Sequence, residues 1–355
     1  MNLKAVIGFA VSALLIWLTL RGVDLGAVWS EVSAANPWLL GGAVFVATFG
    51  FFIRALRWRV LLHPIEPDTS LRARWAAINI GFMANNLLPA RVGEFARAYS
   101  FARLEPKVGA AGALGSLVVE RVLDGIVLAA ILVGVVLLPG FPEVTLGATF
   151  EALLRTAVIL IGGVLLVLVL LLAFPAQVVQ LAGGLARRAL PERVARSVID
   201  ALQAFLQAVS IVRDPRRLAL ALAWSIGFWL WHGLSFYLGM LAFGIDAGIA
   251  AAFFTEGVVG FGVALPAAPG FFGTFHMSVA FSLETVYGVE AARTLAFAYG
   301  YHLGGFIPVT LIGLWYAREL GLSLGDMTAS ENKLDSAVER ELELSHDRVE
   351  QDGLS

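Results

Sequence analysis

Residues 85–95 read NNLLPARVGEF and stand between two long apolar stretches. The segment combines two amides, a proline, a glycine and an arginine–glutamate pair. Pro89 cannot donate a backbone hydrogen bond, and Gly93 weakens a helix. On membrane-insertion scales, Arg91 and Glu94 would each cost about 2.5–3.5 kcal/mol at the centre of a spanning helix. Broken backbone at membrane depth is tolerated only where it packs in protein or lines a wet cavity, so this segment is the first candidate for function.

The composition around this segment is that of a membrane protein. Hydrophobic residues make up 59% of the 355 residues, and charged residues only 15%. A soluble globular chain carries about 25% charged residues. The apolar residues come in runs long enough to span a bilayer, which predicts an all-α polytopic bundle of about six spanning helices. The spans are expected near 3–20, 37–61, 110–138, 152–174, 217–243 and 294–316.

Two further apolar stretches, 73–90 and 249–287, are interrupted at Pro89–Gly93 and at Pro266–Gly273. Basic residues predict how they are threaded. With the N- and C-termini in the cytoplasm, 18 Lys and Arg residues lie inside, Arg54 and Arg57 among them, and three lie outside. A complete crossing by 73–90 would move several arginines to the outside. We therefore expect 73–90 to be a re-entrant hairpin entered from the cytoplasm, and 249–287 one entered from outside.

This arrangement predicts an inverted repeat. The second span, the first hairpin and the third span occur in the same order as the fifth span, the second hairpin and the sixth span, with similar spacings and opposite orientation. Inverted repeats with broken helices are typical of alternating-access transporters. The alternative is that proline and glycine merely kink ordinary spans.

Two segments are expected to lie outside the membrane. Residues 1–317 are predicted to form the transmembrane domain, with a cytoplasmic amphipathic segment at about 176–216. Residues 318–355 contain 4 basic and 10 acidic residues and are expected to form a disordered acidic tail in the cytoplasm. Trp38, Trp58, Trp75 and Trp315 lie near predicted span ends and are interpreted as interface anchors.

Several chemistries lack sequence support. The chain contains no cysteine, which removes disulfides, thiolate metal sites and cysteine nucleophiles. The five histidines show no zinc-hydrolase spacing, and there is no glycine-rich phosphate loop. We therefore expect no metal and no cofactor, and assign no catalytic residue.

A group of charged residues marks one candidate site. Glu120 and Asp124 share a helix face, with Arg121 beside them. The first hairpin supplies Arg91, Glu94 and Arg97. Opposite charges at one depth would neutralise each other, and would also offer arginine to a phosphate and carboxylate to an amine. A purely structural ion-pair network is the alternative, and the two readings are compatible.

The second hairpin supplies the other candidates. Glu256 lies in an apolar run, so it must face protein or water. It would serve either in ion coupling or as a simple buried acid with a hydrogen-bond partner. His232 and His302 are expected to have packing or interfacial roles. Asn79, Asn85 and Asn86 of the first hairpin are expected to cap broken helix ends, with head-group contact as the alternative.

Three motifs carry a family resemblance. NNLLPARVGEFAR at 85–97, VVERVLD at 118–124 and PAAPGFFGTFH at 266–276 resemble motifs of the lysylphosphatidylglycerol synthase transmembrane-region family of flippase-like proteins. The resemblance covers 1–317 and implies a bundle with two re-entrant elements. In two-part members it implies translocation of an aminoacylated phospholipid beside a soluble aminoacyl-transferase domain. Because this chain has only a short tail, lipid aminoacylation is not expected here.

The third motif departs from the family pattern. The common form contains a Gly-Gly pair and a glutamate, whereas Phe271 and Phe272 follow Gly270 here and His276 stands where an acid often occurs. This departure weakens the expectation of a cationic lipid substrate.

We predict a non-enzymatic translocator of a phospholipid or lipid-linked envelope precursor across the bacterial cytoplasmic membrane. The alternatives are an intramembrane lipid or glycan transferase with Glu120 or Asp124 as base, and a non-catalytic partner of an envelope-synthesis enzyme. The expected partners are membrane lipids, a lipid-linked substrate and a separately encoded envelope-synthesis enzyme, without nucleic acid; a homo-oligomer is compatible with the sequence. The candidate substrate-binding or gating residues are Asn86, Pro89, Arg91, Gly93, Glu94, Arg97, Glu120, Arg121, Asp124, Glu256, Pro269, Gly270, Gly273, Thr274 and His276.

Overall fold

A computed structural model describes residues 20–88, 91–142, 173–189, 192–264 and 269–323, together with 14, 16–18, 163 and 325. Every regular element in these residues is helical. The elements are α2 (Leu25–Ala34), α3 (Pro37–Leu62), α4 (Leu71–Leu87), α5 (Gly93–Leu104), α6 (Gly109–Val136), α8 (Pro175–Ala189), α9 (Glu192–Val209), η2 (Ser210–Arg213), α10 (Pro215–Ala242), α11 (Gly248–Gly262), η3 (Pro269–Phe271), α12 (Thr274–Ala280), η4 (Phe281–Val286) and α13 (Ala291–Glu319).

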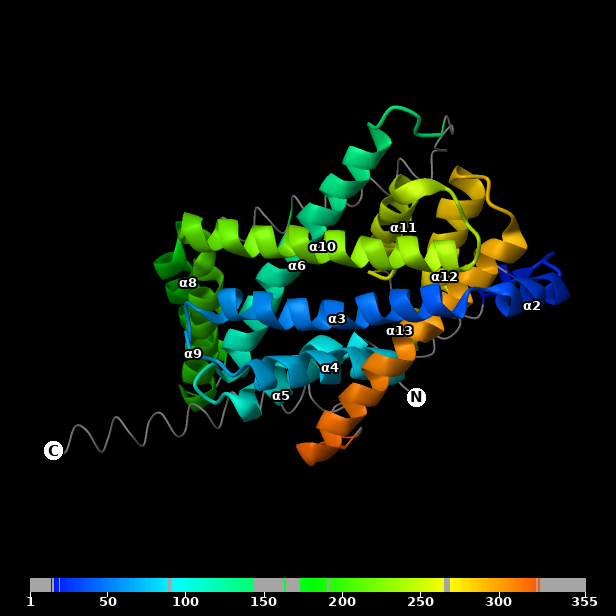
Figure 1. The fold of residues 1–355 in the computed structure, drawn as a ribbon. Helices are drawn as coiled ribbons and strands as arrows, with labels where there is room; N and C mark the ends of the chain where they lie inside the picture. The colour runs from blue at the N-terminus through cyan, green and yellow to red at the C-terminus, as the bar shows by residue number, and fades with distance from the viewer. Residues whose placement is uncertain are drawn as a thin grey trace.

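Helices α3 and α10 lie side by side and antiparallel at the centre of the bundle (Figure 1). Both begin in the same way, with a polar cap followed by proline at the first helical position. The Asn36 side chain accepts hydrogen bonds from two backbone N–H groups of α3, and the Asp214 side chain does the same for α10. Gly50 admits the ring of Phe228, which allows the two helices to approach closely.

Each predicted hairpin is a pair of helices separated by a break. The first consists of α4 and α5, and the second of α11 and α12. Gly93 is required for the first pairing, because a Cβ atom there would lie 2.3 Å from the backbone oxygen of Gly81. Asn85 caps the return helix by accepting the Gly93 N–H at 2.8 Å, as expected for capping. Pro89 and Pro266 lie outside the described residues.

The hairpins pack crosswise. Helix α4 packs against α13, and α11 packs against α6, so each hairpin contacts the long helix that follows the other hairpin. Glycines lie at both crossings: Gly313 contacts Asn79 and Met83, and Gly257 contacts Leu132. Small residues at helix crossings are the usual way in which membrane helices gain packing area.

Helices α8 and α9 lie across one end of the bundle, where α3 ends and α10 begins (Figure 1). They occupy the segment predicted to be amphipathic. Helix α9 packs against α6, where Gly115 approaches Ala208. The placement of this segment at a membrane surface stays a prediction.

Within the described residues, three helices are long and apolar enough to cross a membrane: Pro37–Leu62, Pro215–Ala242 and Ala291–Glu319. They agree with the predicted spans at 37–61, 217–243 and 294–316. The predicted span at 110–138 is the single helix α6, which carries Glu120, Arg121 and Asp124 near its middle. The spans at 3–20 and 152–174, and the acidic tail apart from 318–323 and 325, lie outside the described residues. The count of six spans stays a prediction.

Two expectations are corrected by burial. Arg54 and Arg57 were counted among cytoplasmic residues, but they lie inside α3 with relative exposures of 5% and 0%. Trp58 was interpreted as an interface anchor, but it is fully buried and donates to Ser116 Oγ at 2.9 Å. The physical reason is that this part of α3 is surrounded by α4, α6 and α10 and does not face the interface.

Candidate functional site

Two carboxylates of α6 form the centre of the candidate site. Glu120 and Asp124 are one helical turn apart and are both buried. Arg97 donates to both oxygens of Glu120, each at 2.9 Å. The Arg97 guanidinium also lies 3.9 Å from the ring centroid of Trp58. This bidentate pair joins the first hairpin to α6.

Asp124 is held by side chains of α3 and α10. Arg57 Nη1 lies 2.5 Å from Asp124 Oδ1, and the same nitrogen donates to Ser225 Oγ at 3.0 Å. The indole N–H of Trp229 donates to Asp124 Oδ1 at 3.0 Å. These contacts connect α6 to α3 and α10.

Arg54 and Arg121 add further positive charge to the two ion pairs just described, Arg97–Glu120 and Arg57–Asp124. Arg54 Nη1 donates to Glu120 at 3.2 Å and to Asp124 at 3.3 Å. Its guanidinium carbon lies 4.0 Å from the ring centroid of Phe228. Arg121 donates to Glu120 at 2.6 Å, while its side chain remains 44% exposed. Four arginines thus share two carboxylates, and we call these six residues the arginine cluster: Arg54, Arg57, Arg97, Arg121, Glu120 and Asp124.

The arginine cluster retains unused hydrogen-bond donors. The Nε atoms of Arg54, Arg57 and Arg97 are buried and have no hydrogen-bond partner within the described residues. A buried donor without a partner is costly, and a buried charge without a partner more so. The cluster is therefore suited to accept a further anionic group.

Sequence reasoning identified part of the cluster. Arg97, Glu120, Arg121 and Asp124 are brought together as expected. Arg54 and Arg57 were missed, although ionisable residues inside a predicted span were a usable signal. Ser225 and Trp229 were also missed, because nothing in the local sequence of α10 distinguishes them from packing residues.

Arg91 and Glu94 are the two expected cluster members that lie elsewhere. Arg91 donates to the backbone oxygen of Ala264, and its guanidinium lies 5.4 Å from the ring centroid of Phe271. Both Arg91 and Phe271 have positive φ, at 56° and 59°, which is rare for residues other than glycine. One belongs to each helix break. The two breaks therefore meet, and η3 packs against α4 at this point.

The remaining polar residues of the first hairpin have separate partners. Glu94 is half-buried and accepts from Asn85 Nδ2 at 3.4 Å, at the edge of hydrogen-bonding distance. Asn86 does not cap a helix as expected; it donates to Thr310 Oγ1 of α13 at 2.8 Å. The reason is the packing of α4 on α13, which places a hydroxyl within its reach.

The second hairpin contains a buried acid with one partner. Glu256 is 1% exposed, and its Oε1 lies 2.8 Å from His232 Nδ1 of α10. Its Oε2 has no hydrogen-bond partner within the described residues. His232 thus has more than the packing role expected from its sequence context.

The second break is shaped by glycine. Gly270 and Gly273 have φ of 70° and 93°, in the region that favours glycine, and Pro269 opens the short helix η3. Thr274 Oγ1 donates to the Phe271 oxygen at 3.1 Å. His276 is fully buried, with its ring centroid 4.0 Å from that of Tyr299. These residues lie at the break between α11 and α12 and make no contact with the arginine cluster.

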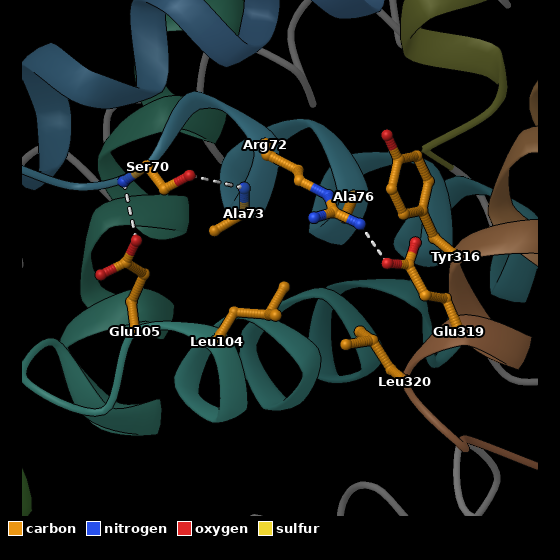
Figure 2. Close-up of a pocket in the computed structure, with 9 residues that line it drawn as sticks. All are labelled: Ser70, Arg72, Ala73, Ala76, Leu104, Glu105, Tyr316, Glu319 and Leu320. Carbon is orange, nitrogen blue, oxygen red and sulfur yellow. Dashed lines mark hydrogen bonds and ion pairs between the residues drawn. The ribbon is translucent and has the colours of Figure 1, made fainter.

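A surface pocket lies apart from the cluster (Figure 2). It has a volume of about 180 Å³ and lies between the start of α4, the end of α5 and the end of α13. Arg72 and Glu319 form an ion pair on its wall, and Glu105 accepts from the Ser70 N–H at 2.7 Å. The residues that line it are Ser70, Arg72, Ala73, Ala76, Leu104, Glu105, Tyr316, Glu319 and Leu320. Within the described part of the chain, no three acidic, histidine or cysteine side chains are grouped to hold a metal.

Comparisons with known proteins place these features in a family. The curated glycosyltransferase AglD of Haloferax volcanii is 25% identical over 366 aligned positions, covering 96% of this chain and 56% of AglD. The chain thus spans about half the length of that relative. No solved structure matches the chain. The expectation of a non-enzymatic protein is contradicted by the match to a glycosyltransferase, so enzymatic activity belongs among the functions to be tested. The family model of the lysylphosphatidylglycerol synthase TM region matches residues 5–313, and the chain therefore belongs to this membrane-protein family.

Proposed function

We propose that this protein moves a lipid with a phosphate head group, either a phospholipid or a lipid-linked envelope precursor, across the cytoplasmic membrane. The observation that carries this proposal is the charge imbalance of the arginine cluster, in which three buried arginines and the partly exposed Arg121 share two carboxylates. Burying excess positive charge among apolar helices is unfavourable without an anion. The phosphate of a lipid is the abundant anion of a bilayer, and arginine binds phosphate with two parallel hydrogen bonds.

The proposed pathway runs between the two hairpins. Contact between their breaks, through Arg91, Ala264 and Phe271, would close it. The crosswise packing of α4 on α13 and of α11 on α6 supports an inverted repeat, in which either hairpin would open in turn. Both termini would lie in the cytoplasm, and a separately encoded envelope-synthesis enzyme would supply or use the lipid.

Gly270→Val tests this pathway. A Cβ atom at Gly270 would lie 2.8 Å from the Phe306 ring, and a side chain at positive φ adds strain of about 1–3 kcal/mol. If the second break must rearrange during transport, lipid movement in reconstituted vesicles should slow by about tenfold or more. Leaflet-selective quenching of a fluorescent phospholipid measures this rate.

Gly244→Val is the matched control. Gly244 also has positive φ, at 67°, but nothing lies within 4 Å of the position that a Cβ atom would take there. It should therefore carry the same backbone strain without obstructing the break, and should move lipid at nearly the wild-type rate. A folded Gly270→Val variant that moves lipid as fast as Gly244→Val would reject the gating role.

The similarity to a glycosyltransferase favours a second candidate, intramembrane transfer of a sugar to or from a lipid phosphate. The arginine cluster would then hold the lipid phosphate as the leaving group when its bond to the sugar breaks, and Glu120 or Asp124 would take the proton from the acceptor hydroxyl that attacks the sugar. Reconstituting the protein in vesicles with a radiolabelled sugar–phosphate lipid and a hydroxyl acceptor separates the two candidates. A transferase converts the lipid on one leaflet, whereas a translocator changes its leaflet distribution and leaves its chemistry unchanged.

A further inference from the structure

A row of contacting side chains connects the arginine cluster to Glu256, the buried acid of the second hairpin. Arg54 lies on the face of Phe228, 4.0 Å from its ring centroid. His232, one turn further along α10, stacks on Phe228 with the ring centroids 5.7 Å apart. His232 Nδ1 then lies 2.8 Å from Glu256 Oε1. Glu256 is thus connected through two rings of α10 to Arg54, the buried arginine of the cluster with the longest ion-pair distances, 3.2 and 3.3 Å.

Glu256 is held in a way that leaves its charge weakly compensated. Its Oε2 has no hydrogen-bond partner within the described residues and lies above Gly233, where a Cβ atom would come within 2.8 Å. His232 retains 27% side-chain exposure. A buried carboxylate with one oxygen that lacks a partner is poorly stabilised. The same arrangement suits a group that binds a proton, because the free oxygen can accept it and the neighbouring histidine can also titrate.

Among the groups packed around Glu256 and His232, Arg54 is the charged neighbour that is linked to them by contacting side chains. Arg54 of α3 lies against the Phe228 ring, which also stacks on His232. Tyr301 of α13 is uncharged and bonded to Ser235. Helix α6 presents Leu128 and Leu132 to α11, and its own carboxylates are paired with arginines. On the second hairpin, His276 of α12 packs against Tyr299, and Glu284 of η4 is exposed.

We propose that Glu256 and His232 form a proton-binding site that is coupled to anion binding at Arg54. This inference rests on the proposed function in one respect, the arrival of a lipid phosphate at the arginine cluster. Without the lipid, the positive charge of Arg54, which lies two side chains away, favours the ionised form of Glu256. A phosphate oxygen bound to Arg54 offsets that charge, so the protonated form of Glu256 becomes favoured and Glu256 takes up a proton. The binding of each anion is thus accompanied by the uptake of about one proton. By reciprocity, protonation of Glu256 raises the affinity of the cluster for the anion.

The pH dependence of lipid affinity tests this coupling. The full chain is purified in an uncharged detergent, and its affinity for dioctanoyl phosphatidylglycerol is measured between pH 5 and 9 by equilibrium dialysis. Protonated Glu256 favours the bound anion, so wild-type affinity should fall as the pH rises, by about 5- to 150-fold in all. Glu256→Gln is neutral at every pH and should keep the high affinity throughout. Glu284→Gln, which changes an exposed glutamate, should behave as the wild type.

His232→Phe is the second variant, in case Glu256→Gln does not fold. It keeps the aromatic stack but removes the ring nitrogen that contacts the Glu256 carboxylate, so the ionised carboxylate loses its polar partner and the affinity change should move to higher pH. Inorganic sulfate, which keeps its charge over this range, replaces the lipid in a parallel series. Equal pH dependence and affinity with sulfate would assign the coupling to any oxyanion; a response only to phosphatidylglycerol assigns it to the lipid.

The outcomes separate this inference from the proposed function. Wild-type affinity that is independent of pH, or a Glu256→Gln variant as pH-dependent as the wild type, overturns the proton site even if vesicles show lipid movement. A pH-dependent affinity that is lost in Glu256→Gln supports the proton site, even if lipid movement is not found and translocation is rejected. If phosphatidylglycerol and sulfate both fail to bind, the anion site and the coupling are rejected together.

Discussion

At the scale of single residues, the arginine cluster depends on two carboxylates that each balance more than one arginine. Glu120 contacts Arg54, Arg57, Arg97 and Arg121 within 3.3 Å, and Asp124 contacts Arg57 and Arg54 within the same distance. Because both carboxylates and all these arginines except Arg121 are buried, removing one carboxylate affects several arginines at once. Glu120 and Asp124 are therefore more sensitive to substitution than any single arginine.

Asp124→Asn tests this sensitivity. The variant leaves four arginines with one carboxylate, and breaking a buried pair in this way costs about 3–5 kcal/mol. We expect the free energy of unfolding to fall by that amount, as measured by steric trapping in bicelles. Asp246→Asn, in the exposed turn before α11, should change it by less than about 0.5 kcal/mol. Equal stability of the two variants would show that the cluster does not stabilise the fold.

At the scale of elements, the first hairpin depends on the close approach of its two helices. Gly81 and Gly93 face each other, and the side chain of Arg97 leaves α5 beside them toward Glu120. The spacing of α4 and α5 thus determines where Arg97 can reach. A hairpin forced apart would withdraw Arg97 from the cluster.

Gly93→Ala tests the hairpin. The new Cβ atom would lie 2.3 Å from Gly81 O and 2.4 Å from Asn85 Cγ, and such overpacking costs about 1–3 kcal/mol. We expect lower stability and weaker binding of phosphatidylglycerol. Gly134→Ala, which meets nothing within 4 Å in α6, should be neutral or stabilising by about 0.4–1 kcal/mol. Gly93→Ala with wild-type stability would contradict the packing argument.

At the scale of the whole molecule, exposed residues mark the two ends of the bundle, and we propose that the end with Lys107 faces the cytoplasm. Lys107 lies after α5, at the end where α3 finishes, and its side chain is 80% exposed. Asp246 lies in an exposed turn after α10, at the end where α3 begins. Ala102, by contrast, is only 8% exposed and is a poor position for labelling.

Single cysteines in this cysteine-free chain test the orientation. We expect Lys107→Cys to react with a membrane-impermeant maleimide only after the cells are opened, because basic residues favour the cytoplasmic side. Asp246→Cys should react in intact cells. The reverse pattern would invert the proposed orientation. Labelling of both positions from one side would contradict the proposal that the two ends of the bundle lie on opposite sides of the membrane.

Hydropathy and helix-breaking residues act along the chain, so they were enough to predict the helical membrane class, three of the long spans and both helix breaks. The charge pattern also grouped Arg97 with Glu120, Arg121 and Asp124. The packing of the helices was needed to show that Arg54 and Arg57 join them, that Arg91 contacts the other hairpin, and that His232 contacts Glu256. The physical reason is that an arginine side chain can reach partners on several helices, and helix packing selects among them.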